Sequence, residues 1–300
     1  MRRDVVLRAL HLCAGYGGFE LGLRLAGVDC RTVCHVERDA YAAAVLVARM
    51  DESRLDQAPV WSDLVTFDGA AWRGRVDIVT AGFPCQPFSA AGKRLGVDDD
   101  RWLWPDIARI IRDVEPRFVF LENVPGVVRA GLAHVLGDLA ALGFDAEWGL
   151  LSAAAVGAPH KRERFWLVGH AAGRESPPLE RAEDSRADTG RAGGRPRPVA
   201  PAGLADTTGE RERKPHLAPC TVPRSNARAD LGGRGFPPHP DDADGWAEWI
   251  AAGGPGPAVR RSTDGPPVGL ADALHLGGNG LVPQCAAEAW RQLTDRLGGV

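Results

Sequence analysis

A cysteine between two prolines is the residue of this 300-residue chain best placed to act as a nucleophile. Cys85 lies in residues 81–89, AGFPCQPFS, at the end of the apolar run Val76–Ala81, which is typical of a buried strand. Ligands of open α/β sheets bind beyond the carboxyl ends of the strands, so this loop should face a crevice. A thiolate stabilised by nearby positive charge would be nucleophilic there. Cys30 and Cys34, inside another expected strand, should instead be small buried hydrophobes.

A glutamate ends another apolar strand. Glu122 closes the expected strand Arg117–Glu122 and should therefore reach the same edge of the sheet as Cys85. A half-buried carboxyl group has a raised pKa and can serve as a general acid near neutral pH. The sequence thus places a candidate nucleophile and a candidate acid at two strand ends.

A basic cluster precedes the expected strand Arg164–Gly169, in residues 157–168, GAPHKRERFWLV. Side chains alternate along an extended chain, so Arg162 and Arg164 should share one face. Two guanidinium groups aimed together at the crevice could clamp a phosphate or a carbonyl oxygen.

A glycine-rich turn, residues 12–19, LCAGYGGF, connects the expected strand Val5–Cys13 to the expected helix Glu20–Leu25. Glycines allow a tight turn and a close approach of the backbone to a ligand. Glu37 ends the second strand, 22 positions after Gly15, where a carboxylate can accept a ribose hydroxyl. The pattern predicts a nucleotide or adenosyl cofactor, and alone it does not separate a nicotinamide dinucleotide from S-adenosylmethionine.

Short apolar runs and helical patterns alternate from Val5 to His170. This alternation predicts an α/β fold, a Rossmann-like, doubly wound and mostly parallel sheet. Residues 171–235 contain 17 glycines and prolines and no Phe, Trp or Tyr, so we expect a small, largely irregular insertion there. The other expected strands are Arg31–Glu37 and Asp145–Ser152, and the other expected helices are Ala40–Arg49, Leu103–Val114, Val127–Leu142 and Pro283–Leu297.

Together these motifs resemble those of the DNA (cytosine-5)-methyltransferases. The resemblance covers most of residues 8–170 and 275–297, and it implies the class I methyltransferase fold. It implies a catalytic domain over residues 1–170, a target-recognition region over residues 171–270, and a C-terminal motif and helix at residues 271–300 that complete the catalytic domain. The matching motifs are CAGYGGF at 13–19, GFPCQPFS at 82–89, ENV at 122–124, RER at 162–164 and GNGLVPQ at 278–284.

The resemblance also implies a reaction, the transfer of a methyl group from S-adenosylmethionine to carbon 5 of a cytosine flipped out of duplex DNA. Cys85 would form a covalent adduct, Glu122 would hold or protonate ring nitrogen 3, and Arg162 and Arg164 would position the base and its phosphate. Glu37 would bind the ribose and Asp63 the adenine amine. The cofactor-binding residues implied are Cys13, Ala14, Gly15, Gly17, Gly18, Phe19, Glu37, Asp63, Pro84 and Asn279, with no metal. His11 and Cys13 stand where the family most often has an acid and a phenylalanine.

Charge and composition set looser bounds. The net charge of −3 suggests no strongly basic surface, but residues 171–235 carry 12 basic against 9 acidic residues, where the family meets DNA. No apolar run is long enough for a membrane span, and six cysteines without a CxxC pair argue against disulfides and zinc. We expect a monomer in the cytoplasm of a bacterium or a phage-infected cell. We also expect it to methylate a specific DNA sequence, either together with a partner restriction endonuclease or to protect a phage genome. The alternatives are a tRNA cytosine-5 methyltransferase, a nicotinamide-dependent oxidoreductase and a non-catalytic DNA-binding protein.

Overall fold

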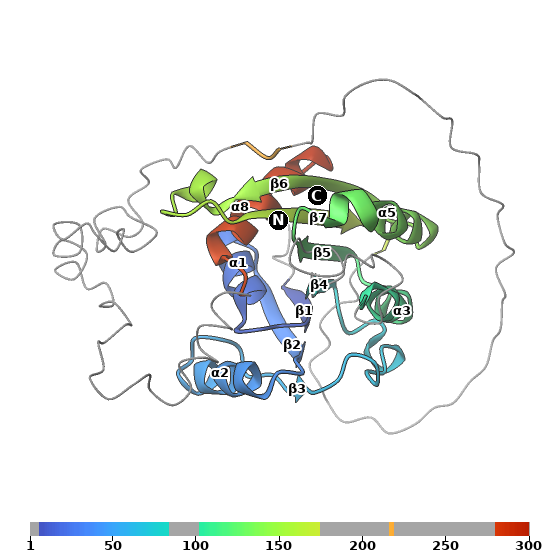
Figure 1. The fold of residues 1–300 in the computed structure, drawn as a ribbon. Coiled ribbons are helices and arrows are strands. Elements are labelled where there is room, and N and C mark those ends of the chain that lie inside the picture. Colours follow the sequence, from blue (N-terminus) through green and yellow to red (C-terminus); the bar gives the residue numbers. More distant parts are fainter. Residues whose placement is uncertain (1–5, 84–101, 175–215, 219–279, 300) are drawn as a thin grey trace, which may run out of the picture.

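The computed structural model describes residues 6–83, 102–174, 216–218 and 280–299 (Figure 1). Cys85, Pro84 and Asn279 lie outside the described residues, as does most of the expected target-recognition region 171–270. None of the described helices is long and apolar enough to cross a membrane.

A seven-stranded sheet forms the centre of the molecule, in the order β3-β2-β1-β4-β5-β7-β6. β7 runs antiparallel to both of its neighbours, and the other described pairings are parallel. The predicted doubly wound, mostly parallel sheet is confirmed. The strands are β1 (Leu7–Leu12), β2 (Cys30–Val36), β3 (Val60–Trp61), β4 (Ile78–Gly82), β5 (Phe118–Asn123), β6 (Asp145–Ser152) and β7 (Glu163–His170).

Helices cover both faces of this sheet. On one face, α1 and α8 lie side by side, and on the other lie α3 and α5 (Figure 1). The period of two in β1 explains this, because Leu10 and Leu12 join the core under α3 while Ala9 joins the core under α1 and α8. The described helices are α1 (Gly18–Ala26), α2 (Ala40–Asp51), α3 (Trp104–Val114), α4 (Val127–Ala130), α5 (Leu132–Ala141) and α8 (Pro283–Arg296).

Local signals account for several helix ends. α1 is capped after Ala26 by Gly27, whose φ of 82° is the left-handed conformation that glycine adopts without strain. α2 begins at Asp39, whose side chain accepts a hydrogen bond from the Ala42 amide at 2.8 Å. The single helix expected over Val127–Leu142 is wrong, because the chain breaks into α4 and α5 at Gly131. Glycine is a poor helix former, so a break there has a small conformational cost.

A close seam joins α1 to α8, although the two helices lie at opposite ends of the chain. A Cβ atom on Gly22 would lie 2.5 Å from Cβ of Ala286 and 3.1 Å from the carbonyl oxygen of Pro283. Glycine is therefore required for α8 to approach α1 this closely. The seam brings the segment just before α8 to the glycine-rich turn.

A buried polar cluster underlies the same turn. Nδ1 of His11 lies 2.8 Å from Oγ1 of Thr80, and its Nε2 lies 3.1 Å from Oγ1 of Thr32. Because the Thr32 hydroxyl donates to Oε2 of Glu20 at 2.7 Å, it accepts from His11, which fixes the neutral Nε2–H tautomer. His35 stacks on His11 with ring centroids 5.3 Å apart. Burial lowers the pKa of both histidines, that of His35 to about 4.

Three residues from the expected irregular insertion are anchored on the sheet. His216 pairs with Leu150 at the outer edge of β6, and Leu217 is only 4% exposed. The side-chain amide of Gln292 in α8 forms two hydrogen bonds with the backbone of Ala218. It accepts from the Ala218 N–H at 2.8 Å and donates to the Ala218 carbonyl oxygen at 2.7 Å. The composition of residues 171–235 contains no signal for this anchor.

Candidate active site

The ends of β4 and β5 lie side by side in the sheet, as the sequence predicts. β4 pairs with β5 in a register that sets Gly82 opposite Glu122. A Cβ atom on Gly82 would lie 3.4 Å from Oε2 of Glu122. The loop that carries Cys85 leaves β4 directly after this point and lies outside the described residues.

The Glu122 carboxyl group is largely buried. Its side chain is 12% exposed, and its Oε1 lies 3.1 Å from Nε of Arg164. Burial raises the pKa of Glu122 to about 7, and the positive charges of Arg164 and Arg162 only partly oppose this rise. A carboxyl group with such a pKa carries a proton in a large fraction of molecules at neutral pH, so it can donate one.

The two arginines reach this edge because β7 is reversed. Its first residues lie beside the last residues of β5, where Glu122 pairs with Trp166. The expectation that Arg162 and Arg164 lie on one extended face is wrong, because the chain turns at Arg162, whose φ is 32°. The turn sends the two guanidinium groups to different partners. Arg164 binds Glu122, while Nη2 of Arg162 donates to the carbonyl oxygen of Gly280.

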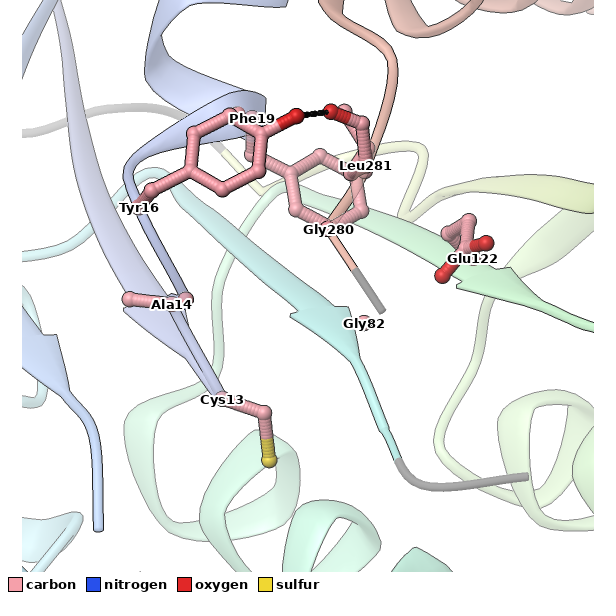
Figure 2. Close-up of a pocket in the computed structure, with 10 residues that line it drawn as sticks. Cys13, Ala14, Tyr16, Phe19, Gly82, Glu122, Gly280 and Leu281 are labelled. Carbon is pink, nitrogen blue, oxygen red and sulfur yellow. Dashed lines mark hydrogen bonds between the residues drawn. The ribbon is translucent and has the colours of Figure 1, made fainter. Parts of the chain in front are cut away.

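A hollow connects the glycine-rich turn with Glu122 (Figure 2). The turn leaves Gly15 with a φ of +55°, and among the described residues beyond its two chain neighbours no atom lies within 4 Å of where its Cβ would be, so a ligand can approach the backbone there. Gly82 and Glu122 complete the far end of the hollow. The residues that line it are Cys13, Ala14, Gly15, Tyr16, Gly18, Phe19, Gly82, Glu122, Gly280 and Leu281.

Glu37 acts on the hollow through the turn. Its Oε2 accepts the Gly15 amide at 2.7 Å and its Oε1 accepts the Asp39 amide at 2.8 Å. Each carboxylate oxygen has a further lone pair for a ligand hydroxyl. The open backbone at Gly15 and this fixed carboxylate fit the adenosine part of an adenosyl cofactor.

Other predicted cofactor residues have different surroundings. Asp63 does not line the hollow. It lies beyond β3, where its Oδ1 accepts the Val65 amide at 3.1 Å. Phe19 lines the hollow but is 4% exposed and packs edge-on against Phe120, with centroids 5.0 Å apart. Gly17, with a φ of +87°, faces Leu55 and not the hollow.

The described cysteines are poor nucleophiles. Burial raises the pKa of Cys13, Cys30 and Cys285 to about 12, and that of Cys34 to about 11. Their thiols are therefore protonated at neutral pH. Cys34 is buried, as expected, whereas Cys30 is only partly buried and packs against the core under α1 and α8. Within the described part of the chain, no cysteine competes with Cys85 as a thiolate.

Four residues that line the hollow were not predicted as site residues, namely Tyr16, Gly82, Gly280 and Leu281. Tyr16 and Leu281 line the hollow, and the Tyr16 hydroxyl donates to the Leu281 carbonyl oxygen (Figure 2). Tyr16 lies within the glycine-rich turn, so an aromatic side chain among glycines was the available signal. Leu281 belongs to the motif at 278–284, of which only Asn279 was assigned a role.

Comparison with known families agrees with this geometry. A family model described as C-5 cytosine-specific DNA methylase matches residues 7–199, which is more than half of the chain. The chain therefore belongs to the C-5 cytosine-specific DNA methylase family.

Curated relatives match about half of the chain. Type II methyltransferase M.NgoMIV of Neisseria gonorrhoeae is 35% identical over 164 residues, which cover 53% of this chain and 50% of the relative. Type II methyltransferase M.NaeI of Lentzea aerocolonigenes is 39% identical over 166 residues, covering 54% and 39%. The matched stretch thus spans half or less of these relatives. Among solved structures, the S. pombe Dnmt2 methyltransferase has a TM-score of 0.46 at 23% identity, covering 56% of this chain and 52% of that one.

Proposed function

We propose that this protein transfers a methyl group from S-adenosylmethionine to carbon 5 of a cytosine in duplex DNA. The observation that carries the proposal is one hollow lined both by the glycine-rich turn and by Glu122. A cofactor bound at the turn and a base held by Glu122 would meet there. Family membership supports the same reaction.

The residues divide the chemistry as follows. Carbon 5 of cytosine is too weak a nucleophile to take a methyl group directly. The Cys85 thiolate adds to carbon 6, and the ring electron pair moves toward carbon 5 while Glu122 protonates ring nitrogen 3. When bound, S-adenosylmethionine would supply the electrophilic methyl group that carbon 5 takes up, and it would leave as S-adenosylhomocysteine. Loss of the carbon 5 proton to a base then expels the Cys85 thiolate, the nitrogen 3 proton returns to Glu122, and the aromatic ring is restored.

The arginines and Glu37 have positioning roles in this proposal. Arg164 holds the Glu122 carboxyl group at 3.1 Å and keeps it oriented toward the base. Arg162, at the same edge, contacts the base or its phosphate. Glu37 fixes the Gly15 amide and accepts the ribose hydroxyl. The target base must leave the helix to reach this edge, at a cost of a few kcal/mol.

Substrate recognition belongs to the part of the chain outside the described residues. We propose that residues 1–170 and 271–300 form the catalytic unit and that residues 171–270 read the DNA sequence. The 12 basic residues of 171–235 would supply phosphate contacts. We further propose that the enzyme is a cytoplasmic monomer that protects DNA against a partner restriction endonuclease, or protects a phage genome.

Incubation with methyl-labelled S-adenosylmethionine and either duplex DNA or tRNA tests this function. We expect label in DNA, at carbon 5 of cytosine within one short sequence. Label in tRNA alone would overturn the DNA assignment, and label in neither would overturn the activity. Cys85→Ser is the matched control, because it should abolish transfer and leave cofactor binding nearly unchanged.

A further inference from the structure

The backbone of residues 280–281 forms one wall of the hollow, and it reaches that wall from the far end of the chain. Gly280 and Leu281 line the hollow together with Gly15, Tyr16 and Gly18 of the turn. The two segments are separated by 265 positions. Long-range contacts must therefore hold this wall in place.

Glycine at position 18 makes the approach possible. A Cβ atom there would lie 3.0 Å from Cδ2 of Leu281 and 3.1 Å from its carbonyl oxygen. Leu281 consequently lies directly on the first residue of α1. This close packing brings the Leu281 carbonyl within reach of the neighbouring Tyr16 hydroxyl.

Tyr16 is itself held from both sides. The Arg49 guanidinium, from α2, lies 5.1 Å from the centroid of the Tyr16 ring and donates to the Tyr16 carbonyl oxygen at 3.0 Å. The Tyr16 hydroxyl in turn donates to the Leu281 carbonyl oxygen (Figure 2). An aromatic side chain fixed at its ring and its backbone is a rigid donor, so little entropy is lost when the hydroxyl binds.

The same two-residue wall is held from the base side of the hollow. Arg162 donates to the Gly280 carbonyl oxygen, one peptide unit from the Tyr16 contact. Tyr16 on the cofactor side and Arg162 on the base side thus hold adjacent carbonyl groups. The backbone of residues 280–281 is therefore tied both to the glycine-rich turn and to the start of β7.

We propose that Tyr16 is a positioning residue for the cofactor, holding the Gly280–Leu281 backbone as the closing wall of the cofactor site through its hydroxyl group. This inference rests on the cofactor of the proposed function. It requires no direct contact between the hydroxyl and the cofactor. Removing the hydroxyl loosens the wall and weakens cofactor binding, while the reacting groups are left in place.

Calorimetric titration of the full chain with S-adenosylhomocysteine, the product of the cofactor, provides the test. We expect Tyr16→Phe to weaken binding roughly fivefold, the effect of losing one hydrogen bond. The KM for S-adenosylmethionine should rise by a similar factor, with kcat within about twofold of the wild type. Tyr41→Phe is the matched control, because Tyr41 is the only other tyrosine and is exposed on α2.

Further measurements separate positioning from general stability. Arg49→Met removes the guanidinium and should weaken binding in the wild type but have much less effect in the Tyr16→Phe background. A Tyr16→Phe variant with a lowered melting temperature and unchanged affinity would overturn the proposal, since that result defines a purely structural role. If the wild type and Tyr16→Phe bind S-adenosylhomocysteine with equal affinity, the role proposed for Tyr16 is wrong and the proposed function remains intact. Absence of binding by the wild type would overturn the cofactor assignment itself.

Discussion

Glu122→Gln should make the protein more stable at alkaline pH, because the fold favours the protonated form of this carboxyl group. Burial raises its pKa from 4.5 to about 7. Between these values the folded state binds a proton that the unfolded state releases, so stability is lost as pH rises through the folded pKa. The full difference corresponds to about 3 kcal/mol once the group is ionised in both states. Glutamine resembles the protonated form and is free of this dependence.

Urea denaturation at two pH values measures the effect. From pH 5.5 to pH 8, the wild type should lose about 2 kcal/mol more stability than Glu122→Gln. The same substitution should remove the proton donor, so kcat falls at every pH. Parallel stability curves for the two proteins would refute the reasoning, because they would show that Glu122 has the same pKa in the folded and unfolded states. Asp106→Asn, which alters a partly exposed ion pair with Arg109 of α3, is the control and should leave the difference in stability between the two pH values unchanged within about 0.5 kcal/mol.

Three further predictions concern the elements that support the site. Gly22→Ala should lower the free energy of unfolding by about 1–3 kcal/mol, because its Cβ would lie 2.5 Å from Cβ of Ala286. Gly137→Ala in α5 should raise it by about 0.5–1 kcal/mol, because an added Cβ there would meet none of the described residues outside its own helix within 4 Å. Equal melting temperatures for the two variants would contradict the α1–α8 seam. The free energy of unfolding should fall on acidification from pH 6.5 to pH 4, because burial lowers the pKa of His35 to about 4 in the folded state. His35→Gln should reduce this loss by up to about 3 kcal/mol. Chemical denaturation that shows the same loss in the variant as in the wild type would contradict this prediction. Leu217→Ala should lower the unfolding free energy by about 2–5 kcal/mol, and a change below about 0.5 kcal/mol would show that the anchor on β6 does not form in solution.

Local sequence patterns predicted the features that depend on neighbouring residues. Short apolar runs predicted β1, β4 and β5. The position of Glu122 at the end of its run predicted that it lies at the carboxyl edge of the sheet. The antiparallel direction of β7 could not be predicted from the sequence pattern, because side chains alternate with the same period of two in parallel and antiparallel strands. That reversal is what places Arg164 beside Glu122.

Features formed by distant segments could not be predicted in this way. The two-residue strand Val60–Trp61 is too short for a period, and the anchor at 216–218 depends on a partner strand and on Gln292. The hydrogen bond from Tyr16 to Leu281 joins positions 265 residues apart. Each of these contacts is selected by packing in the folded chain and leaves little trace in local composition.

Covalent trapping on duplex DNA containing 5-fluorocytosine tests the central claim most directly. Fluorine at carbon 5 cannot leave as a cation, so the elimination that follows methyl transfer would be blocked, with the methylated base still bonded to the cysteine. With S-adenosylmethionine present, we expect a denaturation-resistant protein–DNA adduct, with the modified base on the peptide that contains Cys85. No adduct, or an adduct on one of the buried cysteines such as Cys34, would contradict the assignment of Cys85 and the active site built around it.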